Sequence, residues 1–167
     1  FLSMKTKPTP SELSICLPTF NRLDYLKHTL ENIFYTFRSI SIEVIVVDGG
    51  STDGTVDYLK ELQPSHPIII IQQNVLRGSR HAVQAALDAA RGKFIITRID
   101  HSLSVLEPVL TAMRILDAEP DIGLICERVY KHPARLDKVG LYGNTERILI
   151  RNADKYKADE RYSTYGW

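Results

Sequence analysis

Three polar clusters, each following an apolar run rich in β-branched residues, carry the side chains that suit chemistry on a charged ligand. They are residues 18–22 (Pro-Thr-Phe-Asn-Arg), 48–54 (Asp-Gly-Gly-Ser-Thr-Asp-Gly) and 100–102 (Asp-His-Ser). The second and third clusters contain carboxylates, which accept hydrogen bonds and bind hard cations. A carboxylate that follows a strand also serves as a helix cap or loop ligand, so each one alone is as compatible with a structural role.

The elements that must position these clusters alternate between apolar runs and segments of helical periodicity. That alternation is typical of βαβ units and predicts an α/β fold with a mostly parallel sheet. Because ligands bind beyond the carboxyl ends of the strands in such sheets, the three clusters are expected along one edge. The expected strands are Leu13–Leu17 (stopped by Pro18), Val44–Val47, Ile68–Ile71, Phe94–Ile99, Ile122–Cys126 and a short one at Ile148–Ile150.

Helices are expected between these strands. Asn21 is predicted to cap the first and Asp53 the second. A third carries Val83 to Ala90 on one face and stops at Gly92, and Pro108 suits the first turn of a fourth.

Composition narrows the class of protein. The 167 residues are 44% hydrophobic and 25% charged, which suits one globular domain with a real core. Twenty-one basic against twenty acidic residues leave a net charge of +1, so nucleic acid is a poor candidate partner. No run approaches the roughly 18 apolar residues that span a bilayer. A cytoplasmic domain is expected, with attachment to the inner face of a membrane left open.

Three ordered motifs resemble the inverting family 2 glycosyltransferases. LSICLPTFNRLDYLKHTLENI is similar to the family's opening strand and Pro-Thr-(Phe/Tyr)-Asn-Arg, and EVIVVDGGSTDGT to its strand followed by Asp-x-x-Ser-x-Asp-Gly-Thr. NVLRGSRHAVQAALDAARGKFIITRID is similar to the stretch from Asn-x-x-Gly to the family's aspartate. Three motifs in order are far more specific than one. The resemblance implies a Rossmann-like, three-layer α/β/α fold of the glycosyltransferase-A type, and transfer of a sugar from a nucleotide diphosphate donor to an acceptor hydroxyl.

The resemblance also implies a nucleotide site. Asp48 would accept a hydrogen bond from the base, as the N3 donor of uracil requires, so a UDP-sugar is favoured. Ser51 and Asp53 would stabilise the glycine-rich turn, and Arg77 and Arg80 would flank the diphosphate, although two solvated arginines are an equal alternative. The implied nucleotide-binding residues are Pro18, Thr19, Asn21, Arg22, Asp48, Ser51, Arg77, Gly78 and Arg80.

A divalent cation, Mn²⁺ or Mg²⁺, is the implied cofactor. Asp100 matches the first aspartate of the family's Asp-x-Asp metal motif, and Ser102 stands where the second carboxylate would be. The missing carboxylate puts the metal requirement in doubt. His101 could bind a softer ion, but a surface histidine is more often solvated.

The domain boundaries follow from the same comparison. Residues 1–10 are expected to be an extension, 11–130 the nucleotide-sugar-binding domain, and 131–167 the start of an acceptor-side region. The segment ending in Tyr165-Gly166-Trp167 resembles the stretch before the family's Glu-Asp pair, which supplies the catalytic base. Because the sequence ends there, no catalytic residue is assigned, and Asp159 and Glu160 are not promoted to that role. The acceptor, a glycan or a lipid-linked sugar, stays open.

Other functions compete with this interpretation. A non-catalytic or degenerate nucleotide-sugar-binding module fits the same motifs. A phosphoacceptor receiver domain is disfavoured, because no acidic pair follows the first strand. Dinucleotide and P-loop sites are disfavoured, because neither GxGxxG nor GxxxxGK[ST] occurs.

Overall fold

A computed structural model describes residues 11–126 and 148–151 of the chain. The extension at 1–10, most of the segment 131–167 and the boundary at residue 130 therefore lie outside the described residues. Within them, no helix is long and apolar enough to cross a membrane. The elements, in chain order, are β1 (Leu13–Thr19), α1 (Leu23–Thr36), β2 (Ile42–Asp48), α2 (Thr55–Leu62), η1 (Gln63–Ser65), β3 (Ile68–Gln72), α3 (Ser79–Ala89), β4 (Phe94–Thr97), α4 (Leu106–Ala118), β5 (Leu124–Cys126) and β6 (Ile148–Arg151).

The strands form one sheet in the order β3-β2-β1-β4-β6-β5. Four strands, β3, β2, β1 and β4, are parallel, whereas β6 pairs antiparallel with both β4 and β5. The prediction of a mostly parallel α/β sheet is confirmed. All the strands expected from the sequence are present, including the short one near residue 148.

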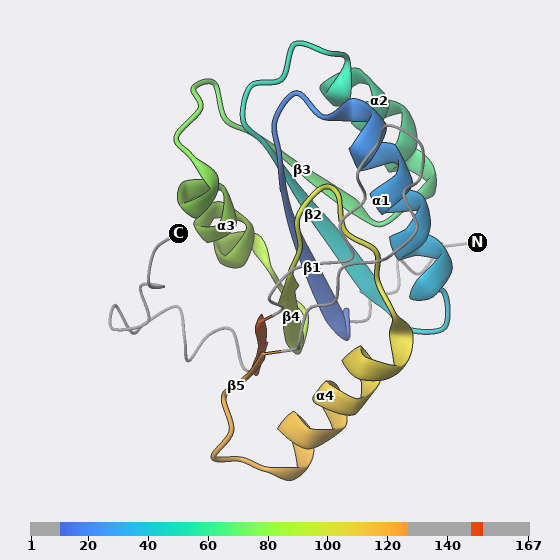
Figure 1. Ribbon diagram of the computed structural model, residues 1–167, viewed down its shortest axis with the longest axis vertical. Helices are drawn as coiled ribbons and strands as arrows, with labels where there is room; N and C mark the ends of the chain where they lie inside the picture. The colour runs from blue at the N-terminus through green and yellow to red at the C-terminus, as the bar shows by residue number, and fades with distance from the viewer. Residues whose placement is uncertain (1–10, 127–147, 152–167) are drawn as a thin grey trace, which may run out of the picture.

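Helices cover both faces of the sheet, as Figure 1 shows. Side chains alternate along each strand, so Ile15 and Val46 face α1, α2 and α4, while Cys16 and Ile45 face α3. The first face packs large residues such as Leu30 of α1 against the strands. The face under α3 is lined by small helix residues, Ala82, Ala86 and Ala90, which bring that helix close to the sheet. The three-layer arrangement is confirmed.

Pro18 does not stop β1, which runs two residues further than expected, to Thr19. Proline lacks an N–H donor and is normally excluded from central strands. Here β1 remains paired with β2 as far as Thr19, but its pairing with β4 ends at Cys16. The last backbone bond on that side runs from the N–H of Arg98 to the carbonyl oxygen of Cys16. Pro18 cannot donate the next one, so β1 and β4 part at their carboxyl ends.

β4 is correspondingly shorter than predicted, ending at Thr97 instead of Ile99. The side chain of Arg98 is buried, and its guanidinium donates to the Leu103 carbonyl oxygen and the Ser104 hydroxyl in the loop that follows. A charged side chain of this size next to the sheet must satisfy its donors locally. The chain therefore turns away from the ladder two residues before the sequence pattern indicated.

Glu43, which is buried in β2, holds the start of β1 and the segment before β4 together through hydrogen bonds. Its Oε1 atom accepts hydrogen bonds from the Ser14 hydroxyl (2.6 Å) and from the backbone N–H groups of Arg91 (2.6 Å) and Gly92 (3.2 Å). Gly92 also donates to the Ser14 oxygen at 2.8 Å. A carboxylate with this many donors is well satisfied, and it ties the entry to β4 onto the two strands beside it.

Gly92 tolerates no side chain, and replacing it with alanine should destabilise the fold. A Cβ atom there would lie 2.6 Å from the Ser14 nitrogen and 2.7 Å from its hydroxyl oxygen, so the strand would have to shift. We expect Gly92→Ala to lower the free energy of unfolding in urea by about 1–3 kcal/mol. Arg91→Ala, which removes the exposed side chain beside it, is the control and should change little. Equal free energies of unfolding for the two variants would contradict the close packing of Gly92 against Ser14.

Candidate functional site

The carboxyl ends of β1, β2 and β3 and the loops that follow them lie along one edge of the sheet, at the top of Figure 1. From β1 the chain proceeds outward on one side, through β2 and β3, and then returns to place β4 on the other side. Such a reversal of strand order creates a crevice, and ligands of open α/β sheets bind there. The pairing of β1 with β4 ends at Cys16, just before this position. The predicted clusters at 18–22 and 100–102 border it.

The carboxylate of Asp100 links the two sides of this crevice. It is buried, with 5% of the residue exposed, and its Oδ2 atom accepts a hydrogen bond from the Thr19 hydroxyl at 3.0 Å. Its Oδ1 atom lies 3.3 Å from Nη1 of Arg22 and 2.9 Å from Nδ1 of His101. Its backbone carbonyl oxygen accepts from the Thr29 hydroxyl of α1 at 2.9 Å. Asp100 is therefore joined to β1, to the start of α1 and to the body of α1.

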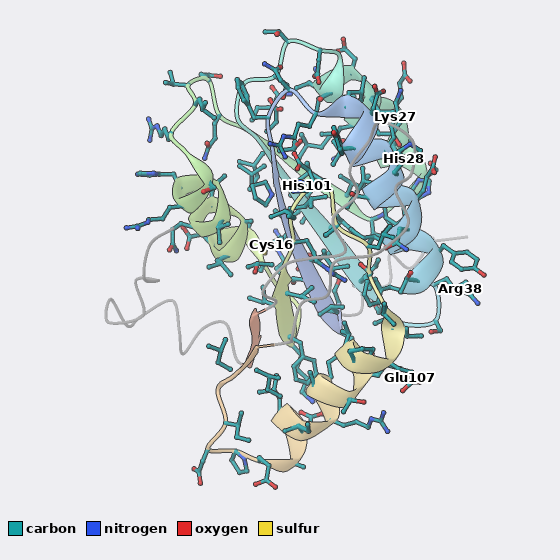
Figure 2. The ribbon with its side chains drawn as sticks, viewed as in Figure 1. Cys16, Lys27, His28, Arg38, His101 and Glu107 are labelled. Carbon is teal, nitrogen blue, oxygen red and sulfur yellow. The ribbon has the colours of Figure 1, made fainter. Side chains whose placement is uncertain are left out.

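Arg22 reaches this carboxylate from the solvent side. Its Nη1 atom also lies 3.0 Å from Nδ1 of His101, and Figure 2 shows His101 in the loop after β4 near α1. Nδ1 accepts from the guanidinium in one neutral tautomer and donates to Oδ1 of Asp100 in the other, so it makes one of these two hydrogen bonds at a time. The Arg22 side chain is 49% exposed, and within residues 11–126 its Nε and Nη2 atoms make no hydrogen bond.

Asn21 and Ser51 join the loop after β1 to the loop after β2. The Asn21 side-chain oxygen accepts from the N–H of Thr52 at 2.8 Å, and the N–H of Asn21 donates to the Ser51 hydroxyl at 2.8 Å. Asn21 has a left-handed backbone with φ of +50°, a conformation that asparagine tolerates better than most residues. Asn21 is therefore not the helix cap that the sequence predicted, since Arg22 holds that position.

Asp48 holds the glycine-rich turn in place. Its Oδ2 atom accepts from the N–H groups of Gly50 and Ser51, both at 3.0 Å, and only 1% of the residue is exposed. The other oxygen, Oδ1, is buried and has no hydrogen-bond partner within the described ranges. Contact of this carboxylate with a base stays a prediction. What the geometry supports is an indirect part in shaping the turn.

Asp53 stabilises the first turns of two helices. Its Oδ1 atom accepts from the N–H (3.1 Å) and hydroxyl (2.6 Å) of Thr55, and its Oδ2 atom accepts from the N–H of Leu23 at 2.9 Å. Burial is the largest single influence and raises the pKa of this carboxyl, but these hydrogen bonds together outweigh it and leave the pKa below its ordinary value. The predicted cap of α2 thus also satisfies the first N–H of α1, although Gly54 is the formal capping residue.

The loop between β3 and α3 supplies cations and an apolar wall. Arg77 and Arg80 are exposed, and Gly78 between them has a φ of +86°, which favours glycine. No contact joins them to Asp100 among the described residues. A Cβ atom on Gly49 would lie 2.9 Å from Leu76 and 3.4 Å from Phe20, so these two exposed apolar side chains flank the glycine-rich turn. The sequence prediction missed this wall and the Thr29 contact, because both join segments that are far apart in the sequence.

The donor atoms present do not fit a divalent-cation site. Ser102 is 1% exposed, and its hydroxyl donates to the Ile99 carbonyl oxygen at 2.9 Å. Both oxygens of Asp100 already have partners, one of them a guanidinium cation. Across residues 11–126, no three His, Cys, Asp or Glu side chains gather closely enough to hold a metal. Among the described residues Asp100 is the one carboxylate at this position, so the other oxygen ligands of a hard cation would have to come from water or from the phosphates of a ligand. The ligand pair of Asp100 and Ser102 stays a prediction.

Comparison with known proteins identifies relatives of this arrangement. The sequence profile described as Glycosyl transferase family 2 matches residues 14–161. A glucuronosyltransferase of Methanococcus voltae that acts on a dolichyl N-acetylglucosaminyl phosphate is 38% identical over 87 residues, covering 50% of this chain and 27% of its own. An abequosyltransferase of Salmonella typhimurium is 30% identical over 120 residues, covering 70% of this chain and 35% of its own. The chain therefore spans about a third of the length of these relatives or less.

Solved structures share the fold. A mannosyltransferase from Pyrobaculum calidifontis, in complex with GDP-Man and Mn²⁺, has a TM-score of 0.66 at 23% identity and covers 86% of this chain and 45% of its own. TarS of S. aureus, residues 1–349 in complex with UDP, has a TM-score of 0.64 at 20% identity, covering 74% of this chain and 37% of its own. At these identities the likeness establishes the fold alone.

The hydrogen bonds of Asp53 give a prediction about pH. Because its pKa is lowered in the folded state, its stabilising contribution is present above the unfolded value of about 3.9 and is lost as the pH falls through the folded pKa. We expect Asp53→Ala to unfold in urea at about 1–2 kcal/mol lower free energy at neutral pH. The difference should shrink as the pH falls towards about 3. Asp57→Ala, an exposed aspartate in the same first turn of α2, is the control. If the loss of unfolding free energy in Asp53→Ala did not change with pH, the ionised carboxylate of Asp53 would not be its source.

Proposed function

The chain belongs to glycosyl transferase family 2, and on that premise we propose that its crevice binds the nucleoside diphosphate part of a sugar donor. The observation that carries the proposal is the convergence of Thr19, Arg22 and Asp100 where β1 and β4 part. These residues come from two of the three predicted clusters, and they occupy the position where open α/β sheets bind nucleotides. The third cluster, the turn held by Asp48, lies beside β1 on its other side.

Within this site the base would lie against the glycine-rich turn, and the phosphates would lie towards the arginines. Phe20 and Leu76 offer the apolar surface that a base packs against. Arg22, Arg77 and Arg80 offer guanidinium groups whose geometry suits phosphate oxygens. A uracil base is favoured by the family resemblance, and a solved neighbour, TarS, holds UDP, whereas the mannosyltransferase holds GDP-Man.

For the whole protein we propose transfer with inversion. An acceptor hydroxyl oxygen attacks the anomeric carbon, the bond from that carbon to the β-phosphate oxygen breaks, and the nucleoside diphosphate leaves with the bonding electrons. The negative charge that develops on the leaving oxygen requires cationic donors already in position, and Arg22 is one. No described residue is assigned as the base that takes the acceptor proton. The acceptor, a glycan or a lipid-linked sugar, is proposed from the relatives' names alone.

A second candidate function is donor binding without transfer. The single carboxylate at 100–102 favours it, because the usual second aspartate is absent. The two candidates separate in one assay: a non-catalytic module binds the nucleotide but releases no sugar, either to water or to an acceptor. Release of free sugar from a UDP-sugar by the chain would exclude the second candidate.

The proposed diphosphate position predicts how arginine variants bind nucleotides. We expect Arg77→Ala and Arg80→Ala to weaken UDP binding, measured by calorimetric titration, by about three- to thirtyfold each, because each removes a charged phosphate contact. Uridine, which has no phosphate, should bind both variants as it binds the original chain. Arg91→Ala removes an equally exposed arginine at the far end of α3 and should leave UDP binding unchanged.

Three results would count against the proposal. Failure of the original chain to bind either UDP or GDP would refute the donor site itself. Unchanged UDP binding in both arginine variants would move the diphosphate away from the β3–α3 loop. An equal loss in Arg91→Ala would show that the effect is only one of net charge.

A further inference from the structure

We infer that the guanidinium of Arg22, not a divalent cation, supplies the positive charge that meets the donor diphosphate at this site. The inference rests on the proposed function, because it concerns how the same crevice neutralises its ligand. It departs from the metal expected from the resemblance, and from the Mn²⁺ that the mannosyltransferase neighbour holds. Three observations support it. Both carboxylate oxygens of Asp100 have partners, the Ser102 hydroxyl is bonded to a backbone carbonyl, and Nε and Nη2 of Arg22 make no hydrogen bond within residues 11–126.

The oxygens of Asp100 are occupied in a way that competes with a metal ion. A divalent cation would have to bind Oδ1 or Oδ2 at about 2.0–2.6 Å. Oδ2 holds the Thr19 hydroxyl at 3.0 Å, and Oδ1 faces the guanidinium at 3.3 Å. A cation on Oδ1 would be a near neighbour of the positive Arg22 and would repel it. Asp100 therefore has room for one positive partner, and Arg22 already takes that place.

Within residues 11–126, no second carboxylate completes a metal site beside Asp100. Ser102 is buried and bonded to the Ile99 carbonyl oxygen, so it cannot take the place of a missing aspartate without a change of conformation. His101 directs its Nδ1 atom towards Arg22 and Asp100. The ring nitrogen therefore lies within hydrogen-bond distance of both members of the Arg22–Asp100 pair and bonds one of them, according to its tautomer. These two residues, which follow Asp100 directly, thus favour an arginine over a metal.

The geometry of Arg22 suits the role that a metal would otherwise fill. One of its nitrogens, Nη1, is fixed by Asp100 and His101, and this contact orients the planar group. The side chain is half exposed, and Nε and Nη2 make no hydrogen bond within residues 11–126, so they remain to donate to phosphate oxygens. A guanidinium whose position is set in advance loses less entropy on binding than a free surface arginine.

The experiment titrates UDP into the protein with excess EDTA and again with Mn²⁺. We expect the two dissociation constants to agree within about twofold, because no metal takes part. Arg22→Ala should weaken UDP binding in EDTA by about ten- to a hundredfold, the loss expected for a charge-assisted contact. The same variant should bind uridine as the original chain does. Arg22→Lys keeps the charge but not the planar fork, and should recover only part of the affinity.

Arg38→Ala is the matched control. Arg38 is an exposed arginine just beyond α1, at the opposite end of the helix from Arg22, and Figure 2 shows it there, far from His101 along the helix. Its guanidinium bonds the Tyr35 carbonyl oxygen, so its removal should not affect the crevice. Thermal unfolding of each variant shows whether a loss of binding reflects a loss of fold, and the retained uridine affinity gives a second check.

The outcomes separate the two proposals. UDP binding that is tenfold or more tighter with Mn²⁺ than with EDTA would overturn the inference while supporting the donor site. UDP affinity unchanged in Arg22→Ala would also overturn it. Absence of UDP and GDP binding in both conditions would overturn the proposed function and the inference with it. Equal binding with and without Mn²⁺, weakened in Arg22→Ala and unchanged in Arg38→Ala, would establish the arginine as the counter-charge.

Discussion

The parallel register of β1 with its two neighbours is the constraint on which the site depends. Thr19 at the end of β1 lies opposite Asp48 at the end of β2. On the other side of β1, the pairing with β4 ends at Cys16, because Pro18 has no N–H to donate. The pairing of β1 with β2 therefore aligns the clusters at 18–22 and 48–54, whereas the pairing of β1 with β4 ends before the cluster at 100–102. The core on each face of the sheet fixes this register, since a shift by one residue would exchange the faces of Ile15 and Cys16.

The loops after β1 and β2 contain few apolar side chains, and hydrogen bonds between the two loops hold them in place. Asn21, Ser51 and Asp53 each join the loop after β1 to the loop after β2. The left-handed backbone of Asn21 has a cost, which its bonds to Ser51 and Thr52 offset. Residues predicted to touch the nucleotide thus contact one another first. A site assembled in this way is ordered before its ligand arrives, which reduces the entropy lost on binding.

The sequence predicted the fold well because the fold follows from local patterns. β-Branched runs such as residues 44–47 and 68–71 became strands, and the spacing of Leu26, Leu30 and Ile33 became the buried stripe of α1. The errors occurred where distant partners override local preference. Pro18 was expected to end a strand, but pairing with β2 carries the chain past it. Asn21 was expected to cap a helix, but its side chain bonds a loop 31 residues away.

The candidate site was predictable in its members but not in its connections. Motif spacing identifies Thr19, Arg22 and Asp100, yet 81 residues separate the first from the last, and no pattern in the sequence shows that they share hydrogen bonds. Arg98 shows the same limit of sequence-based prediction for a buried residue outside the site. A lone arginine after an apolar run is expected at the surface, yet Arg98 is buried, and its guanidinium donates to Leu103 and Ser104 of the following loop.

Charge balance explains why Asp100 and Arg22 belong to one unit. A carboxylate that is 5% exposed requires a positive or hydrogen-bonding partner, and Thr19 alone leaves most of its charge uncompensated. Arg22 provides the compensation in the absence of ligand and keeps part of its guanidinium at the surface. When a diphosphate binds, the same cation can serve both anions, because its donors point in several directions in one plane. On the role proposed for Arg22, a metal ion would compete with this arginine for the Asp100 carboxylate, because both are positively charged.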